Sequence, residues 1–203
     1  MAHEARHAAI NDPAPYDATT RLIHLFLAAV GIAALASGQF AGDYRRPVHT
    51  GFEIHSWAGI AMAVALGLRF VWGLAGPSEV RFSSWLPFTR AKLMAVREDL
   101  AALARLRIPE RADHGGLAGL VQAIGLLAFA WMALTGAILF AYLETGARAT
   151  GWLRAVKESH EGAQPVVLAY VGLHVGAVIA HSLAGYPVWR RMLPWLRRDA
   201  GGS

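Results

Sequence analysis

Three histidines in the last third of the chain have the spacing of one helix face. His160, His174 and His181 are separated by 14 and 7 residues, and the surrounding residues are mostly apolar. At about 100° per residue these spacings leave offsets of roughly 40° and 20°, with His160 roughly 21 Å from His174 along the axis. Imidazoles inside a bilayer are costly unless they are ligated, paired or hydrated. The stripe therefore indicates ligands or a proton pathway rather than packing histidines alone.

The composition predicts the helices that must position these histidines. The chain is 55% hydrophobic and 16% charged, which is typical of an integral membrane protein. Four apolar stretches are long enough to cross a bilayer. They cover about 22–40, 52–74, 117–143 and 165–183. We therefore expect an all-α membrane protein, a four-transmembrane-helix bundle that forms a single domain over residues 1–203.

The basic residues predict the orientation of the bundle. Thirteen lysines and arginines flank the side that holds both termini, against five on the opposite side. By the positive-inside rule, both termini are cytoplasmic and the protein is a multi-pass protein of the bacterial inner membrane. The net charge of +5 then reflects topology, and no basic run interleaved with aromatic residues predicts binding of nucleic acid.

This orientation places four histidines at two depths. His24 is expected near the cytoplasmic end of the first helix, and His55 near the external end of the second. The fourth helix enters from outside, so His160 should pair with His55 at the outer level and His174 with His24 at the inner level. Two neutral imidazoles on opposite helices are the ligands of a six-coordinate haem iron, which leaves no open position for oxygen chemistry.

The chain contains no cysteine. This excludes Cys-ligated iron–sulfur clusters and covalent attachment of haem through C-x-x-C-H, so a haem here must be held non-covalently. A zinc protease is excluded as well, because His160-Glu161 lacks the second histidine of H-E-x-x-H and has Gln at position 164.

Two further residues near His55 are candidates for contact with the cofactor. Gly59 follows His55 by one turn, and a small residue there gives space for a macrocycle between helices that normally approach to about 8–10 Å. Arg69 lies 14 residues after His55, on the same face but at the cytoplasmic end. Its guanidinium is expected to neutralise a propionate of the inner haem or to snorkel to the lipid headgroups.

The connection between the second and third spans has an amphipathic pattern. Leu93, Val96, Leu100 and Leu103 have helical spacing, with basic residues between them. This predicts a cytoplasmic helix over about 88–107 that lies on the anionic inner leaflet or docks on a partner subunit.

Three segments together resemble the bacterial cytochrome b561 family, which includes the b-type cytochrome subunits of nickel–iron hydrogenases. They are RLIH at 21–24, HSWAGIAMAVALGLRFVWGLAGPSEVRF at 55–82 and SHEGAQPVVLAYVGLHVGAVIAH at 159–181. The resemblance implies a four-helix membrane cytochrome that binds haem b, with two haems ligated by His24, His55, His160 and His174 and a single haem as the alternative. It also matches His181, for which a quinone or proton site and a packing role are both open.

The expected function is electron transfer between an external redox partner, such as a hydrogenase, a dehydrogenase or a cytochrome c, and the quinone pool. A stand-alone quinone-linked oxidoreductase of the same family is the alternative, and association into a homo-oligomer is compatible with both. No residue is assigned to independent substrate catalysis. A haem-free transporter that uses the histidines as a proton relay is a hypothesis from another class, which the absence of a b-type haem spectrum would favour.

Overall fold

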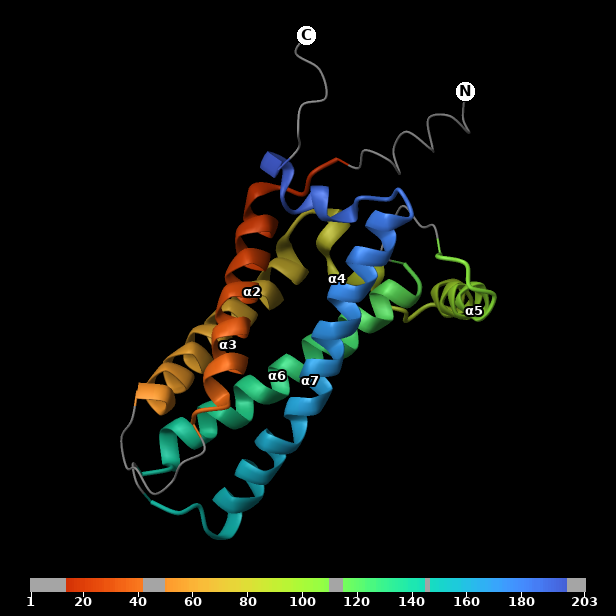
Figure 1. The fold of residues 1–203 in the computed structure, drawn as a ribbon. Coiled ribbons are helices and arrows are strands. Elements are labelled where there is room, and N and C mark those ends of the chain that lie inside the picture. Colours follow the sequence, from red (N-terminus) through yellow and green to blue (C-terminus); the bar gives the residue numbers. More distant parts are fainter. Residues whose placement is uncertain (1–13, 42–49, 110–114, 145–146, 197–203) are drawn as a thin grey trace, which may run out of the picture. The chain divides into compact units, whose positions relative to one another are not determined.

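The computed structural model describes residues 14–41, 50–109, 115–144 and 147–196. Across this part of the chain the structure is helical and contains no strand (Figure 1). Four helices are long and apolar enough to span a membrane. These are α2 (Ala18–Gly38), α3 (Thr50–Ala75), α6 (Leu117–Tyr142) and α7 (Gly151–Leu183). The expected all-α fold with four membrane spans is thus confirmed.

The helix α7 begins well before the apolar stretch that predicted it. It starts at Gly151 rather than near residue 165 and includes Pro165 in its interior. Its first turns are charged, with ion pairs one turn apart between Arg154 and Glu158 and between Lys157 and Glu161. Such pairs stabilise an exposed helix. Hydrophobicity reveals only the part of a helix that crosses the hydrocarbon, so this polar extension did not appear as a span.

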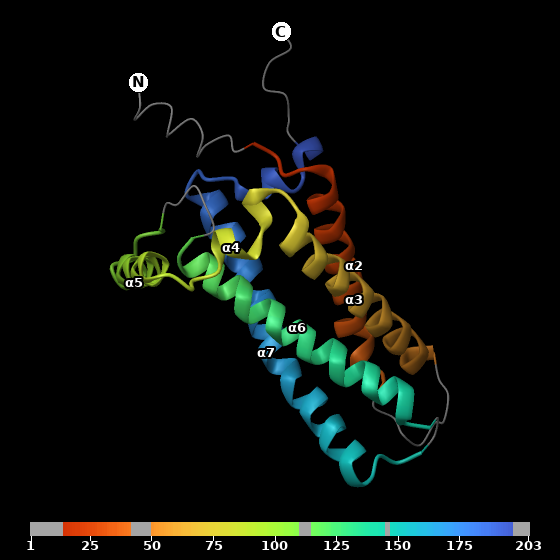
Figure 2. The same cartoon turned by 180° about the vertical axis from the view of Figure 1, so that it is seen from behind.

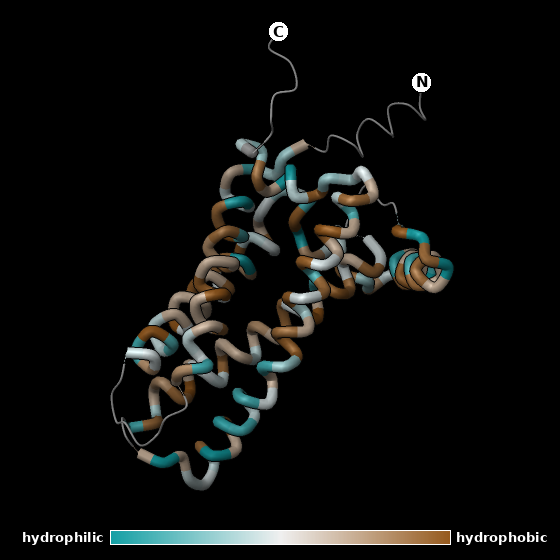
Figure 3. Tube along the Cα trace, in the orientation of Figure 1, coloured by the Kyte–Doolittle hydropathy of each residue, from teal (hydrophilic) through white to brown (hydrophobic). Residues whose placement is uncertain are grey.

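The long helices leave most of their apolar side chains on the surface. Among these side chains, Leu127 on α6 is 67% exposed and Leu173 on α7 is 65% exposed. Hydrophobic residues occur along each of the long helices, whereas the first turns of α7 are hydrophilic (Figure 3). Apolar side chains on the outer surface of a helix are favourable when the helix is surrounded by lipid instead of water.

The chain divides into two compact units, which we describe separately. The histidine unit comprises Ile23–Leu74 and Ile124–Tyr170, and the terminal unit comprises Met1–Leu22, Ala75–Ala123 and Val171–Ser203. Parts of all four long helices pack together in the histidine unit. The contacts join α2 to α3 and α6 at Gly31, α3 to α6 through Trp57 and Phe140, and α6 to α7 through Phe129 and Tyr170.

The terminal unit holds the short elements of the chain (Figure 2). They are η1 (Ser78–Val80), α4 (Phe82–Trp85), α5 (Arg90–Ala104), η2 (Val188–Arg191) and η3 (Pro194–Leu196). Arg191 joins three segments of this unit, since its carbonyl accepts from the Tyr16 amide at 3.0 Å and its guanidinium lies 4.0 Å from the Tyr16 ring centroid. The same guanidinium is 3.6 Å from the Glu79 carboxylate.

Candidate functional site

The histidine unit brings together the imidazoles of His55 and His160. His55 lies near the start of α3 and His160 in the charged, N-terminal part of α7. Their ring centroids are 6.1 Å apart, and the ring planes make an angle of 77°. Both residues are partly exposed. Two imidazoles from helices far apart in the sequence therefore face each other across the bundle.

A backbone carbonyl fixes the ring of His55. Its Nδ1 lies 2.9 Å from the carbonyl oxygen of Ala34 on α2. A carbonyl can only accept, so Nδ1 carries the hydrogen and donates it. The lone pair of this neutral imidazole is then on Nε2, and the ring presents Nε2 as a ligand.

A threonine on α6 holds His160 in the same way. The Nδ1 of His160 lies 2.9 Å from the hydroxyl oxygen of Thr135, which is itself 2.8 Å from the carbonyl oxygen of Trp131. Because the Thr135 hydroxyl donates to that carbonyl, its oxygen accepts from the His160 Nδ1–H. In both histidines Nδ1 is thus engaged by the protein, and Nε2 is the nitrogen left for a ligand.

Glycines on the neighbouring helices allow these ring positions. A Cβ at Gly38 of α2 would lie 3.3 Å from Cε1 of His55, and a Cβ at Gly136 of α6 would lie 3.1 Å from Cε1 of His160. Both distances are tighter than ordinary van der Waals contact. Each imidazole therefore packs against the backbone of an adjacent helix, which limits its movement.

A second contact keeps α6 and α7 in register beside His160. The indole nitrogen of Trp131 donates to the hydroxyl of Ser159 at 3.0 Å. Ser159 is adjacent to His160 in the sequence, and Trp131 lies one turn before Thr135 on α6. The hydrogen bonds at Ser159 and His160 thus fix both the height and the rotation of α7 against α6.

The structure gives the position of each of the other predicted site histidines within its own helix and unit. His24 lies on α2 in the histidine unit, whereas His174 and His181 lie on α7 in the terminal unit. The pairing of His24 with His174 joins residues of different units and stays a prediction. His181 donates from Nδ1 to the carbonyl of Ala177 on its own helix, at 2.8 Å. This leaves Nε2 of His181 as the nitrogen that a ligand can address.

Two residues near His55 on α3 were also expected to contact the cofactor. A Cβ at Gly59 would meet no atom within 4 Å, so no protein contact at this position requires glycine. Arg69 lies in the last third of α3 and is partly buried. His3, His7, His49 and His114 lie outside the described residues.

Sequence reasoning missed the groups that orient the histidines. These groups are the Ala34 carbonyl, the Thr135 hydroxyl, Gly38 and Gly136. Thr135-Gly136 is the one pair of these that a sequence reading could have found, because a polar residue stands next to glycine within the apolar run LAFAWMALTGAILF. Backbone carbonyls leave no trace in the sequence.

The donor set fits a metal that a macrocycle holds. Among the described residues, no group of three or more His, Cys, Asp or Glu side chains is placed to bind a metal ion. Two imidazoles that held one metal ion between them, with metal–nitrogen bonds of about 2 Å, would have ring centroids roughly 6 Å apart. The observed 6.1 Å between His55 and His160 agrees with this separation. Two axial imidazoles suffice for haem iron, because the porphyrin supplies the remaining ligands.

The comparisons with known proteins point to the same chemistry. A family model for prokaryotic cytochrome b561 matches residues 15–195, which is most of the chain. No curated protein and no solved structure matches the chain.

Proposed function

Because the chain belongs to the prokaryotic cytochrome b561 family, we propose that it carries electrons across the bacterial inner membrane between an external redox partner and the quinone pool. Membership of this family makes the protein a membrane b-type cytochrome that binds haem b and transfers electrons. The partner, the link to quinone and the number of haems belong to our proposal.

The pair formed by His55 and His160 is the observation that carries this function. Each ring donates from Nδ1, to the Ala34 carbonyl and to the Thr135 hydroxyl, so Nε2 of each would be the nitrogen that binds the haem iron. A haem b bound there supplies a one-electron Fe(III)/Fe(II) couple. His55 and His160 would together hold the haem iron with no position left for oxygen or substrate, which would favour electron transfer.

The position of His160 supports exchange with a partner outside the bilayer. The turns of α7 before it carry exposed charges, including Arg154 and Glu158, and Glu161 follows it directly. A helix segment with this charge density lies in water or among headgroups rather than in hydrocarbon. These charges support our placing of the pair near a membrane surface, where a soluble redox partner could approach it.

We assign the second haem to His24 and His174 and a propionate contact to Arg69. This assignment is supported by the family and by the spacing of His160 and His174 on α7, roughly 21 Å along the axis. Haems at the two levels would form a relay between the membrane faces. His181 then borders the quinone or proton-exchange site at the inner level.

The proposal is tested with the purified full-length protein in liposomes that contain quinone. A membrane-impermeant reductant is added outside, and reduction of haem and of quinone is followed optically. The wild type should show a low-spin b-type spectrum and reduce the quinone, whereas His55→Ala should lose the outer haem and the quinone reduction. A protein that binds no haem, or a haem reduced without any quinone turnover, contradicts the proposal.

A further inference from the structure

The end of α5 has an unusual residue at a helix-capping position. The amides of Leu106 and Arg107 donate to the carbonyls of Leu103 and Ala102, each at 2.9 Å, which is the hydrogen-bond pattern of a Schellman motif. Leu106 occupies the left-handed position of this motif with a φ of 56°. Glycine normally fills that position, because a Cβ there is strained.

The end of α7 provides the comparison within the same unit. Tyr186 and Gly185 donate to the carbonyls of His181 and Ser182 in the same pattern, and the left-handed residue is Gly185 with a φ of 91°. The chain thus uses glycine in one Schellman motif and a strained leucine in the other. Leu106 is also 96% exposed, so no contact with the described protein compensates for the strain. An apolar environment around Leu106 would compensate for it.

Other apolar side chains of α5 are also exposed. The helix buries Val96 and Asp99, while Leu93, Leu100 and Leu103 are between 44% and 52% exposed. These three leucines lie within a sector of roughly 80° when plotted at about 100° per residue. Val96 lies within the same sector and is buried, so the leucines surround a point at which α5 contacts the protein and remain about half exposed themselves. We call these three leucines together with Leu106 the leucine face.

The contact of Asp99 places α5 at a membrane boundary. Its carboxylate accepts from the amide of Leu117 at 2.9 Å, and Leu117 is the first residue of the membrane span α6. A carboxylate is favourable there, because the N-terminus of a helix carries positive partial charge. Figures 1 and 2 both view α5 along its axis, while the first turns of α6 run across the picture. The amphipathic helix therefore lies crosswise at the level where α6 begins.

The charges around α5 are complementary to an anionic surface. Between η1 and Ile108 the chain carries six basic residues against two acidic ones, and Asp99 is one of the two. The Asp99 carboxylate contacts the N-terminus of α6, so it adds little negative charge to the exposed surface. The exposed surface is strongly positive, with Arg90, Arg97, Arg105 and Arg107 on or beside α5.

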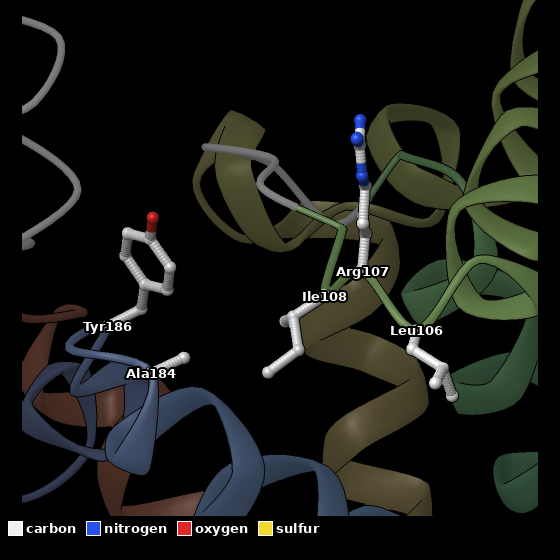
Figure 4. Close-up of a pocket in the computed structure, with 5 residues that line it drawn as sticks. All are labelled: Leu106, Arg107, Ile108, Ala184 and Tyr186. Atoms are coloured by element: carbon white, nitrogen blue, oxygen red, sulfur yellow. The ribbon is translucent and has the colours of Figure 1, made fainter.

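An open pocket next to Leu106 has the same amphipathic character. It has a volume of about 450 Å³ and is lined by Leu106, Arg107, Ile108, Ala184 and Tyr186. In Figure 4, the guanidinium of Arg107 and the hydroxyl of Tyr186 extend away from the side chains of Ile108 and Ala184. Apolar walls below polar groups match the boundary between acyl chains and headgroups.

We propose that α5 docks on the anionic lipid leaflet, with the leucine face among the upper acyl chains and the neighbouring arginines on the lipid phosphates. This docking explains four observations at once. They are the strain at Leu106, the exposure of the leucine face, the crosswise position of α5 and the positive charge around it. Docking would hold the long connection between α3 and α6 against the membrane.

The absence of native cysteine makes a labelling test direct. Leu100→Cys and Glu98→Cys place one fluorophore each on the full-length protein, at positions roughly 200° apart around α5. In nanodiscs that contain phosphatidylglycerol, the label at residue 100 should be quenched by a lipid-borne quencher several-fold more than the label at residue 98. The reverse order is expected with iodide. Equal quenching by iodide at both positions overturns the proposal, and protection of residue 100 only in native membranes assigns the face to a protein partner instead.

Two further variants separate the contributions of charge and of Leu106. Arg97→Gln combined with Arg105→Gln and Arg107→Gln should lower lipid quenching at residue 100 to the level found in phosphatidylcholine nanodiscs. Leu106→Gly keeps the helix cap without its strain and should also lower lipid quenching, while the haem spectrum stays unchanged as a measure of correct folding. If lipid quenching at residue 100 is unchanged in both variants, the proposed docking through the arginines and Leu106 is wrong.

Discussion

The imidazole of His160 donates from Nδ1 to the hydroxyl of Thr135 at 2.9 Å, while its ring centroid lies 6.1 Å from that of His55. One nitrogen of His160 is thereby committed to the protein, and the other is available to a metal. The same division applies to His55 and the Ala34 carbonyl. Four helices cooperate in this arrangement, since the rings come from α3 and α7 and their partners from α2 and α6. The first two predictions follow from it.

Removing either member of the pair should remove the same haem. We expect His55→Ala and His160→Ala each to lower the haem content by about half and to eliminate the same redox transition, because a bis-histidine site needs both ligands. His24→Ala and His174→Ala should eliminate the other transition. Redox titration of the four variants tests this, with His49→Ala, at a position outside the described residues, as the control that keeps both haems. Any other grouping of the four variants contradicts the assignment.

The Thr135 hydroxyl should tune the outer haem. Thr135→Val removes the acceptor for the His160 Nδ1–H and lowers the basicity of the ligand, so we expect a higher midpoint potential. Loss of such an outer-shell partner commonly lowers affinity by about 10–100-fold. Thr135→Ser keeps the hydroxyl and should behave like the wild type. Potentiometry and haem retention measure both effects, and equal potentials in the valine and serine variants would show that the hydrogen bond has no tuning role.

The approach of α6 to α7 should not tolerate a larger residue at Gly125. A Cβ there would overlap the ring of Tyr170, which also contacts Phe129. We expect Gly125→Ala to lower the melting temperature, because overpacking costs about 1–3 kcal/mol. Gly162→Ala on α7 is the matched control, since a Cβ at Gly162 meets no atom within 4 Å and gains up to about 1 kcal/mol of helix propensity. Similar melting temperatures for the two variants would contradict the close approach.

His181 should affect quinone chemistry without binding haem. Its Nδ1 donates to the Ala177 carbonyl, so Nε2 can accept a hydrogen bond and a proton from a quinol. His181→Ala should leave both haem spectra intact and slow haem reduction by a quinol analogue at least several-fold. The control is Ser182→Ala, which removes a hydroxyl that bonds only along its own helix among the described contacts. Loss of a haem would make His181 a ligand, and unchanged kinetics would leave it a packing residue.

The start of α2 should loosen at acid pH. Burial raises the pKa of the Asp17 carboxyl, but hydrogen bonds from the Thr20 side chain and from nearby amides lower it by more, so the pKa lies below its usual value. This stabilisation is fully present above the unfolded-state pKa of about 4 and is lost as pH falls through the depressed value. We expect hydrogen-exchange protection of the Thr20 amide to fall with pH in the wild type, relative to Asp17→Asn. Parallel pH profiles in the two proteins would contradict the role of the charge.

Local properties of the sequence determined the secondary structure and the type of cofactor. Apolar length sets the four spans, the residue types supply imidazole ligands, and the lack of cysteine excludes covalent haem. The match to the family confirms the resemblance that three segments carried. The amphipathic pattern likewise predicted a helix in the connection, which the structure shows as Arg90–Ala104.

Contacts between helices were decided by the tertiary structure alone. The partner of the His55 Nδ1 is a carbonyl 21 residues away, and the partner of the His160 Nδ1 is a hydroxyl 25 residues away. Helical periodicity states which residues share a face, but the rotation of each helix about its axis depends on packing, as at Gly38, Gly136 and Gly125. The sequence therefore determined which histidines are available as ligands. The packed helices decided that His55 and His160 meet, and that Nδ1 of each ring is engaged by the protein while Nε2 is left for a ligand.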